Sequence, residues 1–172
     1  SGVSLKGDLL FCAVAGEEEG SPGTISLIER GIRADAVIVG EPIGRDAIAI
    51  TQKGLEWFDF IVHGKTVHGG NQEEGINAIL KANKLINALQ DILAPRLKLR
   101  KHPLMGESTM NIGVISGGTQ LSTVAGECIV KMDRRFLPQI ETYESMVSEL
   151  EEIIDDLGRE DPDFRCTLKV SD

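Results

Sequence analysis

Short apolar runs and turn-forming residues alternate in the first third of the chain. The runs at residues 9–14 and 36–39 have the length of buried strands, and an amphipathic turn at residues 25–28 lies between them. Gly31 is placed to end that helix in the left-handed conformation. A strand, a helix and a strand within roughly thirty residues form a βαβ unit, whose two strands are parallel.

A different pattern begins near residue 54. Phe58, Phe60 and Val62 alternate, which predicts one face of a strand. A helix with a broad apolar stripe should follow. The stripe comprises Ile76, Ile79, Leu80, Leu85, Ile86, Leu89 and Leu93.

The second half repeats this alternation with two strands, a helix and a last strand. We expect strands over residues 110–115 and 128–132, and a final strand over residues 164–170. Before the final strand, apolar residues recur at helical spacing over residues 143–157, with Thr142 as the expected N-cap and Gly158 as the expected C-terminal stop. The order strand, helix, strand, strand, helix, strand is that of a ferredoxin-like βαββαβ domain.

The predicted fold therefore has two parts. Residues 1–53 form a partial α/β domain, the edge of a parallel βαβ sheet, and residues 54–172 form an α+β, ferredoxin-like domain. One sheet face and the edge strands of such a domain need cover, and pairing with a second copy across a two-fold axis supplies it.

Carboxylates follow both strands of the predicted βαβ unit. Glu17, Glu18 and Glu19 come soon after the first strand, and Glu41 follows the second, directly before Pro42. Parallel strands bring these side chains to one edge of the sheet, where like charges repel. The arrangement suits a cation held by oxygen ligands with a spare carboxylate as base. A solvated acidic turn is the alternative.

Several motifs together resemble the M20 metallopeptidase family, which includes acetylornithine deacetylases, succinyl-diaminopimelate desuccinylases, aminoacylases and zinc carboxypeptidases. They occur in the family's order along almost the whole chain. The matching segments are residues 15–24 (AGEEEGSPGT), 39–42 (VGEP), 64–70 (GKTVHGG), 75–79 (GINAI), 102–106 (HPLMG), 111–113 (NIG) and 133–138 (DRRFLP).

The resemblance implies roles for the carboxylates. Glu17 matches the general base, Glu18 a metal-binding carboxylate, and Glu41 a ligand of one of the two zinc ions of the family site, with cobalt as an alternative metal. A register shifted by one residue, with Glu18 as base and Glu19 as ligand, stays open because relatives differ in the spacing to the following glycine.

The resemblance also implies roles for residues of the second domain, which would be a lid that forms a homodimer. His68 matches a histidine that reaches the active site of the other subunit and stabilises an oxyanion. Arg135 matches an arginine that binds a substrate carboxylate, although a surface salt bridge is its alternative. Ser122 stands where many relatives have an asparagine that holds substrate.

Composition excludes other classes of protein. A net charge of −9 argues against nucleic acid as a partner, and no apolar run approaches the length of a membrane span. Three cysteines without a C-x-x-C spacing indicate buried, reduced thiols, which are typical of a cytoplasmic protein.

We therefore expect a fragment of a zinc-dependent hydrolase that cleaves the amide of an N-acyl amino acid or short peptide. The family's H-x-D segment, bridging aspartate and further histidine have no match here, so the chain alone should be inactive. Two alternatives remain: a non-catalytic ferredoxin-like dimerisation or binding module, and a catalytically dead relative.

Overall fold

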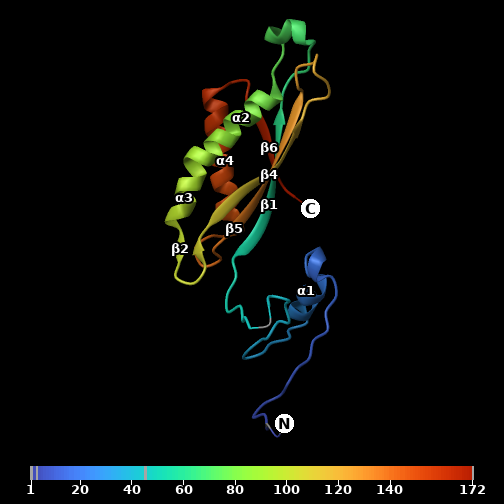
Figure 1. Cartoon of the computed structure of the whole chain (residues 1–172), viewed down its shortest axis with the longest axis vertical. Helices are drawn as coiled ribbons and strands as arrows, with labels where there is room; N and C mark the ends of the chain where they lie inside the picture. The colour runs from blue at the N-terminus through green and yellow to red at the C-terminus, as the bar shows by residue number, and fades with distance from the viewer. Residues whose placement is uncertain (1, 3, 45, 172) are drawn as a thin grey trace. The chain divides into compact units, whose positions relative to one another are not determined.

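The computed structural model describes residues 2, 4–44 and 46–171, and the chain divides into two compact units, Ser1–Ala47 and Ile48–Asp172. Figure 1 shows the elements of both units along the chain. The first contains a short 3-10 turn, η1 (Glu17–Glu19), and a helix, α1 (Pro22–Glu29). No helix among the described residues combines the length and the apolar character that a membrane span requires.

The first unit confirms the predicted helix but not the predicted strands. Pro22 occupies the first turn of α1, where its missing N–H costs nothing, and Gly31 follows the helix with φ 79°. Residues 9–14 and 36–39 are not strands, and Phe11 and Ile38 are 88% and 98% exposed. Parallel strands are stable when both faces are covered, and the described residues of this unit cover neither run. Cys12 is exposed as well, contrary to the expected burial.

The second unit contains the sheet and the longer helices. Its elements are β1 (Gly54–His63), the 3-10 segment η2 (Gly69–Glu74), α2 (Ala78–Ala88), the π-helical turn η3 (Leu89–Leu93), α3 (Ala94–Leu99), β2 (Lys101–His102), β3 (Gly106–Glu107), β4 (Thr109–Gly117), β5 (Glu127–Phe136), α4 (Tyr143–Glu160) and β6 (Arg165–Val170).

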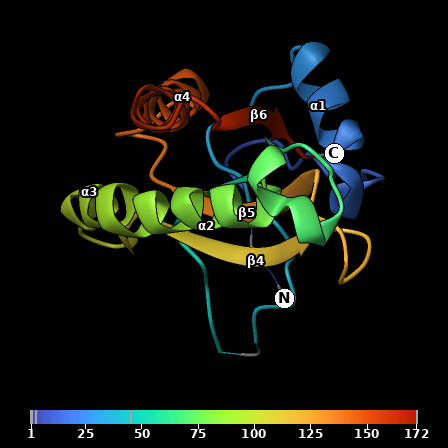
Figure 2. The same cartoon turned by 90° about the horizontal axis from the view of Figure 1, so that it is seen from above.

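The main sheet has four strands in the order β4-β5-β1-β6, and every neighbouring pair is antiparallel. Figure 2 shows β4 and β6 toward opposite edges, with β5 between them. The helices lie on one side of this sheet (Figure 1). The small hairpin β2–β3 follows α3.

Alternation along the central strands divides core from surface, as the sequence predicts. Phe58, Phe60 and Val62 are fully buried on the helix side of β1. On β5 the alternate residues Cys128, Val130 and Met132 are buried opposite them. Apolar side chains of α2, α3 and α4 complete this core, including Leu85, Leu97, Met146, Leu150 and Ile153.

The first long helix of this unit is continuous through α2, η3 and α3. Pro95 lies in the first turn of α3, directly after the π-helical turn η3. A proline inside a helix lacks the N–H that would bond the carbonyl one turn earlier, and a wider turn relieves the resulting clash. Leu89, Leu93 and Leu97 stay buried along the whole length, so the change of pitch does not rotate the apolar stripe out of the core.

The second long helix, α4, begins as predicted and ends later. Thr142 and Ser145 form a capping box, in which the Ser145 N–H donates to Thr142 Oγ1 and the Thr142 N–H donates to Ser145 Oγ. The prediction that Gly158 stops the helix is wrong, because α4 continues to Glu160. Pro162 disfavours a helical conformation at Asp161, whose φ and ψ are −131° and 98°.

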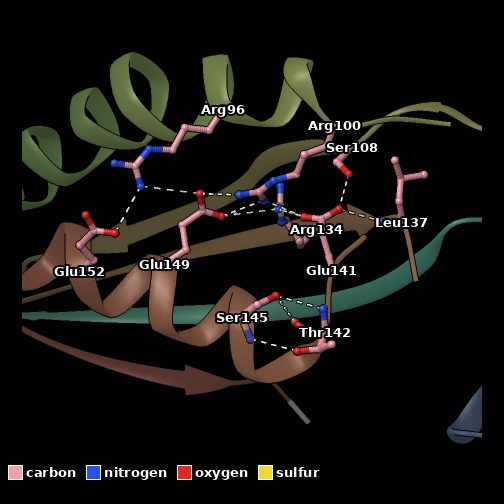
Figure 3. Close-up of polar contacts among 10 residues, drawn as sticks. All are labelled: Arg96, Arg100, Ser108, Arg134, Leu137, Glu141, Thr142, Ser145, Glu149 and Glu152. Carbon is pink, nitrogen blue, oxygen red and sulfur yellow. Dashed lines mark hydrogen bonds and ion pairs between the residues drawn. The ribbon is translucent and has the colours of Figure 1, made fainter. Parts of the chain in front are cut away.

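A buried ionic network joins β5 to the helices (Figure 3). Arg134 is 1% exposed and Glu141 is 3% exposed, and Arg134 Nη2 donates to Glu141 Oε1. Glu141 also accepts from the hydroxyl of Ser108, from the N–H of Leu137 at 3.0 Å and from Arg100 Nη1 at 2.8 Å. Both carboxylate oxygens are therefore satisfied, as a buried charge requires.

The network continues to the surface along α4. Arg100 donates from Nη2 to Glu149 Oε1 at 2.8 Å, and from Nη1 to Glu149 Oε2 at 2.9 Å. Arg96 lies 3.7 Å from Glu149 and 3.4 Å from the exposed Glu152. The basic residues near the end of α3 thus pair within the domain, and the pairs tie α3, α4 and the segment after β5 together.

Burial alone would raise the pKa of Glu141, but its donors outweigh this effect. The hydroxyl of Ser108, the N–H of Leu137 and the charges of Arg134 and Arg100 all favour the carboxylate, so the pKa lies below its ordinary value of 4.5. A carboxyl group whose pKa is lower in the folded state stabilises the fold above the unfolded-state pKa. That contribution is lost as the pH falls through the folded-state pKa.

We predict that Glu141→Gln lowers the free energy of unfolding at pH 7 by about 3 kcal/mol, because it removes the hydrogen-bonded counter-ion of the buried Arg134 and leaves only Glu149, at 3.9 Å. The difference between wild type and variant should shrink as the pH falls below about 4.5. Urea unfolding at a series of pH values measures both. Glu152→Gln, which alters the more exposed pair between α4 and Arg96 of α3, should cost less than about 0.5 kcal/mol. An equal effect of the two substitutions would contradict the prediction.

Candidate functional site

The acidic segment forms a tight turn at the surface of the first unit. Glu17–Glu19 make one 3-10 turn between Gly16 and Gly20, whose φ angles are 75° and 81°. Ser21 follows at φ 57° and donates from its hydroxyl to the carbonyl of Glu17 at 3.3 Å. All three carboxylates are exposed, so the turn presents them to solvent.

The metal ligands that the resemblance implies do not assemble into a site here. Glu18 and Glu41 are both exposed in the first unit. Within residues 2, 4–44 and 46–171, no three His, Cys, Asp or Glu side chains lie close enough together to hold a metal ion. A zinc site takes three or four protein ligands, so the described residues alone do not fit the ion.

The loop that carries His68 extends the pairing of β1 with β5. The N–H of Gly64 donates to Gly126 at 2.8 Å, that of Val124 to Val67 at 2.9 Å, and that of Gly69 to the Ser122 carbonyl at 2.7 Å. The structure therefore pairs His68 with Thr123, and Ser122 is the next residue along that partner segment.

A second set of backbone bonds holds the same loop from its other side. Lys65 and Ile76 exchange N–H···O bonds of 2.8 and 3.1 Å, and the N–H of Ala78 donates to Ala125 at 2.8 Å. Gly64 is required at this junction, since a Cβ there would overlap the carbonyl oxygen of Ile76 and lie 2.8 Å from that of Ala125. The motif glycine thus serves a close backbone approach.

The ring of His68 is exposed and has a defined orientation. Its Nδ1 accepts the N–H of Gly70 at 3.1 Å, which caps the segment η2. A neutral imidazole that accepts at Nδ1 carries its proton on Nε2. His68 therefore presents an N–H donor to solvent, the group that an oxyanion requires.

Arg135 lies on the outer face of the sheet, the face that the helices do not cover. Its cross-strand partner in the pairing of β1 with β5 is Leu55. Its Nε donates to Asp133 Oδ1 at 2.9 Å, and the other oxygen of Asp133 accepts the indole N–H of Trp57 at 3.1 Å. The surface salt bridge considered as an alternative therefore exists, and in the described part of the chain it engages only Nε of Arg135.

His68 and Arg135 lie at opposite ends of one sheet. Arg135 is near the start of β1, and His68 follows the end of that strand. A strand rises about 3.3 Å per residue, so the ten residues of β1 separate the two ends by roughly 30 Å. Within one copy of the chain, these two side chains cannot both contact one small molecule.

The sequence alone indicates no role for Trp57 or Asp133. Asp133 and Arg135 are two residues apart on a strand, so the sequence spacing already places them on one face. The participation of Trp57 depends on the register of β1 against β5, which brings Trp57 opposite Asp133. The sequence contains no signal for that register.

Comparisons with known proteins agree on one class of enzyme. A family model described as a peptidase dimerisation domain matches residues 50–162. The chain is 34% identical over 173 residues to an N-formyl-4-amino-5-aminomethyl-2-methylpyrimidine deformylase of Halalkalibacterium halodurans, covering 95% of this chain and 40% of the relative. It is 30% identical over 169 residues to an acetylornithine deacetylase of Myxococcus xanthus, covering 96% and 44%.

Solved structures show the same fold. An amidase of the hydantoinase/carbamoylase family from Burkholderia phymatum matches with a TM-score of 0.55 and 18% identity over 69% of this chain and 28% of that one. An aminobenzoyl-glutamate utilization protein from Klebsiella pneumoniae matches with a TM-score of 0.51 and 22% identity, with the same coverage. The chain spans about two-fifths of the length of the curated relatives it matches.

We predict that neutral His68 is predominantly the Nε2–H tautomer, because Nδ1 accepts the N–H of Gly70. Long-range proton–nitrogen correlation spectra of the neutral imidazole identify the protonated nitrogen. Gly70→Pro removes the N–H donor and should increase the population of the other tautomer. A predominantly Nδ1–H ring in the unmodified chain would contradict the geometry.

Proposed function

This chain belongs to the M20 peptidase family, and from that premise we propose that it is part of a metal-dependent hydrolase that cleaves the amide of N-acyl amino acids or short peptides. Its relatives are hydrolases, and the matched family model covers most of its second unit. The observation that carries the proposal is the joint presence of an exposed carboxylate turn, a histidine that presents Nε2–H, and a half-exposed arginine whose ion pair with Asp133 is made through Nε.

We assign the second unit to the ferredoxin-like class and to the role of a lid. The chain order of its main elements is β1, α2, β4, β5, α4 and β6, and the sheet order is β4-β5-β1-β6. An antiparallel sheet with this connectivity and helices on one face is the ferredoxin-like arrangement. Its other face and the two edge strands remain to be covered.

The lid is proposed to form a homodimer. Strand β4 is an edge strand, and Val114 and Ile115 on it are 49% and 54% exposed. Edge strands with exposed apolar residues pair readily with another copy. The separation of His68 from Arg135 supports the same conclusion, because a two-fold axis can bring His68 of one copy toward the substrate held by the other.

For the chemistry we propose Glu17 as the general base. Its carboxylate takes a proton from the attacking water and passes it to the leaving amine, while Nε2–H of His68 from the second copy stabilises the oxyanion. Glu18 and Glu41 are proposed as ligands of zinc, or of cobalt, in the complete protein. Arg135 binds the substrate carboxylate, and Ser122 contacts the substrate from the loop beside His68.

A second candidate substrate class is an N-formyl amine without a carboxylate. The deformylase relative is named for a formylated aminomethylpyrimidine, and it is 34% identical to this chain. Arg135 would then have no carboxylate to bind. Dependence of activity on the substrate carboxylate therefore separates the two classes.

We predict that the complete protein hydrolyses members of a panel of N-acetyl, N-succinyl and N-formyl substrates and dipeptides, and that a chelator abolishes this activity. Glu17→Gln should lower kcat by about a thousandfold, as expected for the loss of a general base. Glu19→Gln, in the same exposed turn, is the matched control and should change kcat little. Loss of activity in the Glu19 variant with retention in the Glu17 variant would establish the shifted register. No turnover by folded, metal-loaded protein would favour the dimerisation module or the dead relative.

We further predict that His68 acts in trans. Glu17→Gln and His68→Ala subunits, co-expressed with different tags and purified as a heterodimer, contain one intact site and one doubly altered site. The heterodimer should recover about half of the wild-type activity, whereas either variant homodimer should be nearly inactive. Light scattering confirms the dimer. A heterodimer no more active than the variant homodimers would show that His68 acts within its own subunit.

A further inference from the structure

We propose that Asp133 and Trp57 form a positioning device that fixes the guanidinium of Arg135 for a substrate carboxylate. This inference rests on the proposed function of Arg135 and deepens it. It assigns the orientation of the carboxylate-binding group to two further residues on the outer face of the sheet.

The contacts form one continuous chain across two strands. The indole Nε1–H of Trp57 on β1 donates to Asp133 Oδ2 at 3.1 Å, and Arg135 Nε on β5 donates to Asp133 Oδ1 at 2.9 Å. Trp57 and Asp133 are directly opposite each other in the register, and Arg135 is two residues further along β5. Both oxygens of one carboxylate are therefore occupied, and each restrains a different neighbour.

The bond to Nε determines how Arg135 can bind an anion. A guanidinium is a planar fork with five N–H donors, and a carboxylate can bind it along the Nε side or across the two terminal nitrogens. Asp133 takes the Nε position, so the remaining approach is end-on, to Nη1 and Nη2 together. Because the plane of the fork is fixed, less side-chain entropy is lost when the substrate binds.

The strand beneath this device is held from the opposite face. Arg134 lies between Asp133 and Arg135 in sequence, and its side chain is buried against Glu141 under the helices. The backbone of residues 133–135 is thus fixed by the core network, while their alternate side chains face outward. Arg135 remains 48% exposed, and Asp133 is 25% exposed. The backbone that carries Asp133 and Arg135 is therefore held in place, while the guanidinium of Arg135 is accessible to solvent.

Trp57 supplies more than a hydrogen bond. It is the one tryptophan of the chain, and 48% of its surface is exposed beside the Asp133–Arg135 pair. Its indole ring offers an apolar surface next to the proposed carboxylate position. Its fluorescence reports directly on this part of the sheet.

The test compares two substrates of the complete protein that differ only in the carboxylate: an N-acyl amino acid and the corresponding amino-acid amide. Asp133→Ala should raise KM for the acid about tenfold and change kcat less than twofold, and it should leave KM for the amide nearly unchanged. Trp57→Phe should raise KM for the acid about threefold. Asp133→Asn, which keeps an acceptor for Nε, should restore most of the affinity lost in Asp133→Ala.

Coupling to Arg135 distinguishes positioning from general structural damage. In an Arg135→Lys background, Asp133→Ala should have no further effect on KM for the acid, because the group that it orients is absent. Arg159→Gln, at an exposed arginine of α4, is the control and should leave KM unchanged for both the acid and the amide. Equal losses for the acid and the amide, or additive effects of the two substitutions, would overturn the proposal.

If the complete protein hydrolyses none of these substrates, the proposed function fails. The proposed positioning of Arg135 is then tested by measuring whether the chain binds a carboxylate. The probe is then N-acetylglycine titrated into this chain, followed by Trp57 fluorescence, with N-acetylglycinamide as the uncharged control. A saturable change with the acid alone, abolished by both Asp133→Ala and Arg135→Lys, would support a carboxylate site without the proposed chemistry. No saturable change would overturn both proposals.

Discussion

The pairing of β1 with β5 is the contact on which the rest of the second unit depends. It runs from Gly54 opposite Phe136 to His63 opposite Glu127, and its backbone bonds continue past His63 into the loop of His68. One register therefore sets the positions of the core, the buried ionic network, the exposed cluster around Arg135 and the histidine loop. A slip by one residue would exchange the inner and outer faces and remove all four arrangements at once.

The two faces of β5 do different work within three consecutive residues. Arg134 is buried and neutralised by Glu141, at the cost of removing two charges from water. Asp133 and Arg135 face outward and pair with each other and with Trp57. The buried pair fixes the strand, and the fixed strand gives the exposed guanidinium a defined direction. Stability and proposed substrate recognition are coupled through the backbone that the two sets of side chains share.

In the first unit, the apolar runs do not form strands, because no other described residues of that unit pack over them. Its carboxylate turn and α1 are defined by local signals, namely glycines with positive φ and a proline in the first helical turn. Its apolar runs have strand-like sequences but remain exposed, because a parallel strand is stabilised by neighbours on both sides and both faces. Glu18 and Glu41 accordingly stay apart from any third ligand among the described residues.

The sequence by itself determined the features that rest on periodicity and local chemistry: the alternation on β1 and β5, the existence of α1, α2 and α4, the Thr142 cap and the glycine-rich loop of His68. Its apolar stripe for α2 was only partly right, because Ile76 precedes the helix and Ile79 and Leu80 on it are exposed. The glycine at position 158 predicted too early an end for α4. The helix continues to Glu160, because the signal that ends it is the effect of Pro162 on the backbone of Asp161. Only the tertiary structure decided that His68 and Arg135 lie at opposite ends of the sheet, that Trp57 meets Asp133, and that Arg134 finds Glu141. These are contacts between residues brought together by strand register and helix packing, and neither composition nor spacing along the chain encodes which partner a charged side chain will meet.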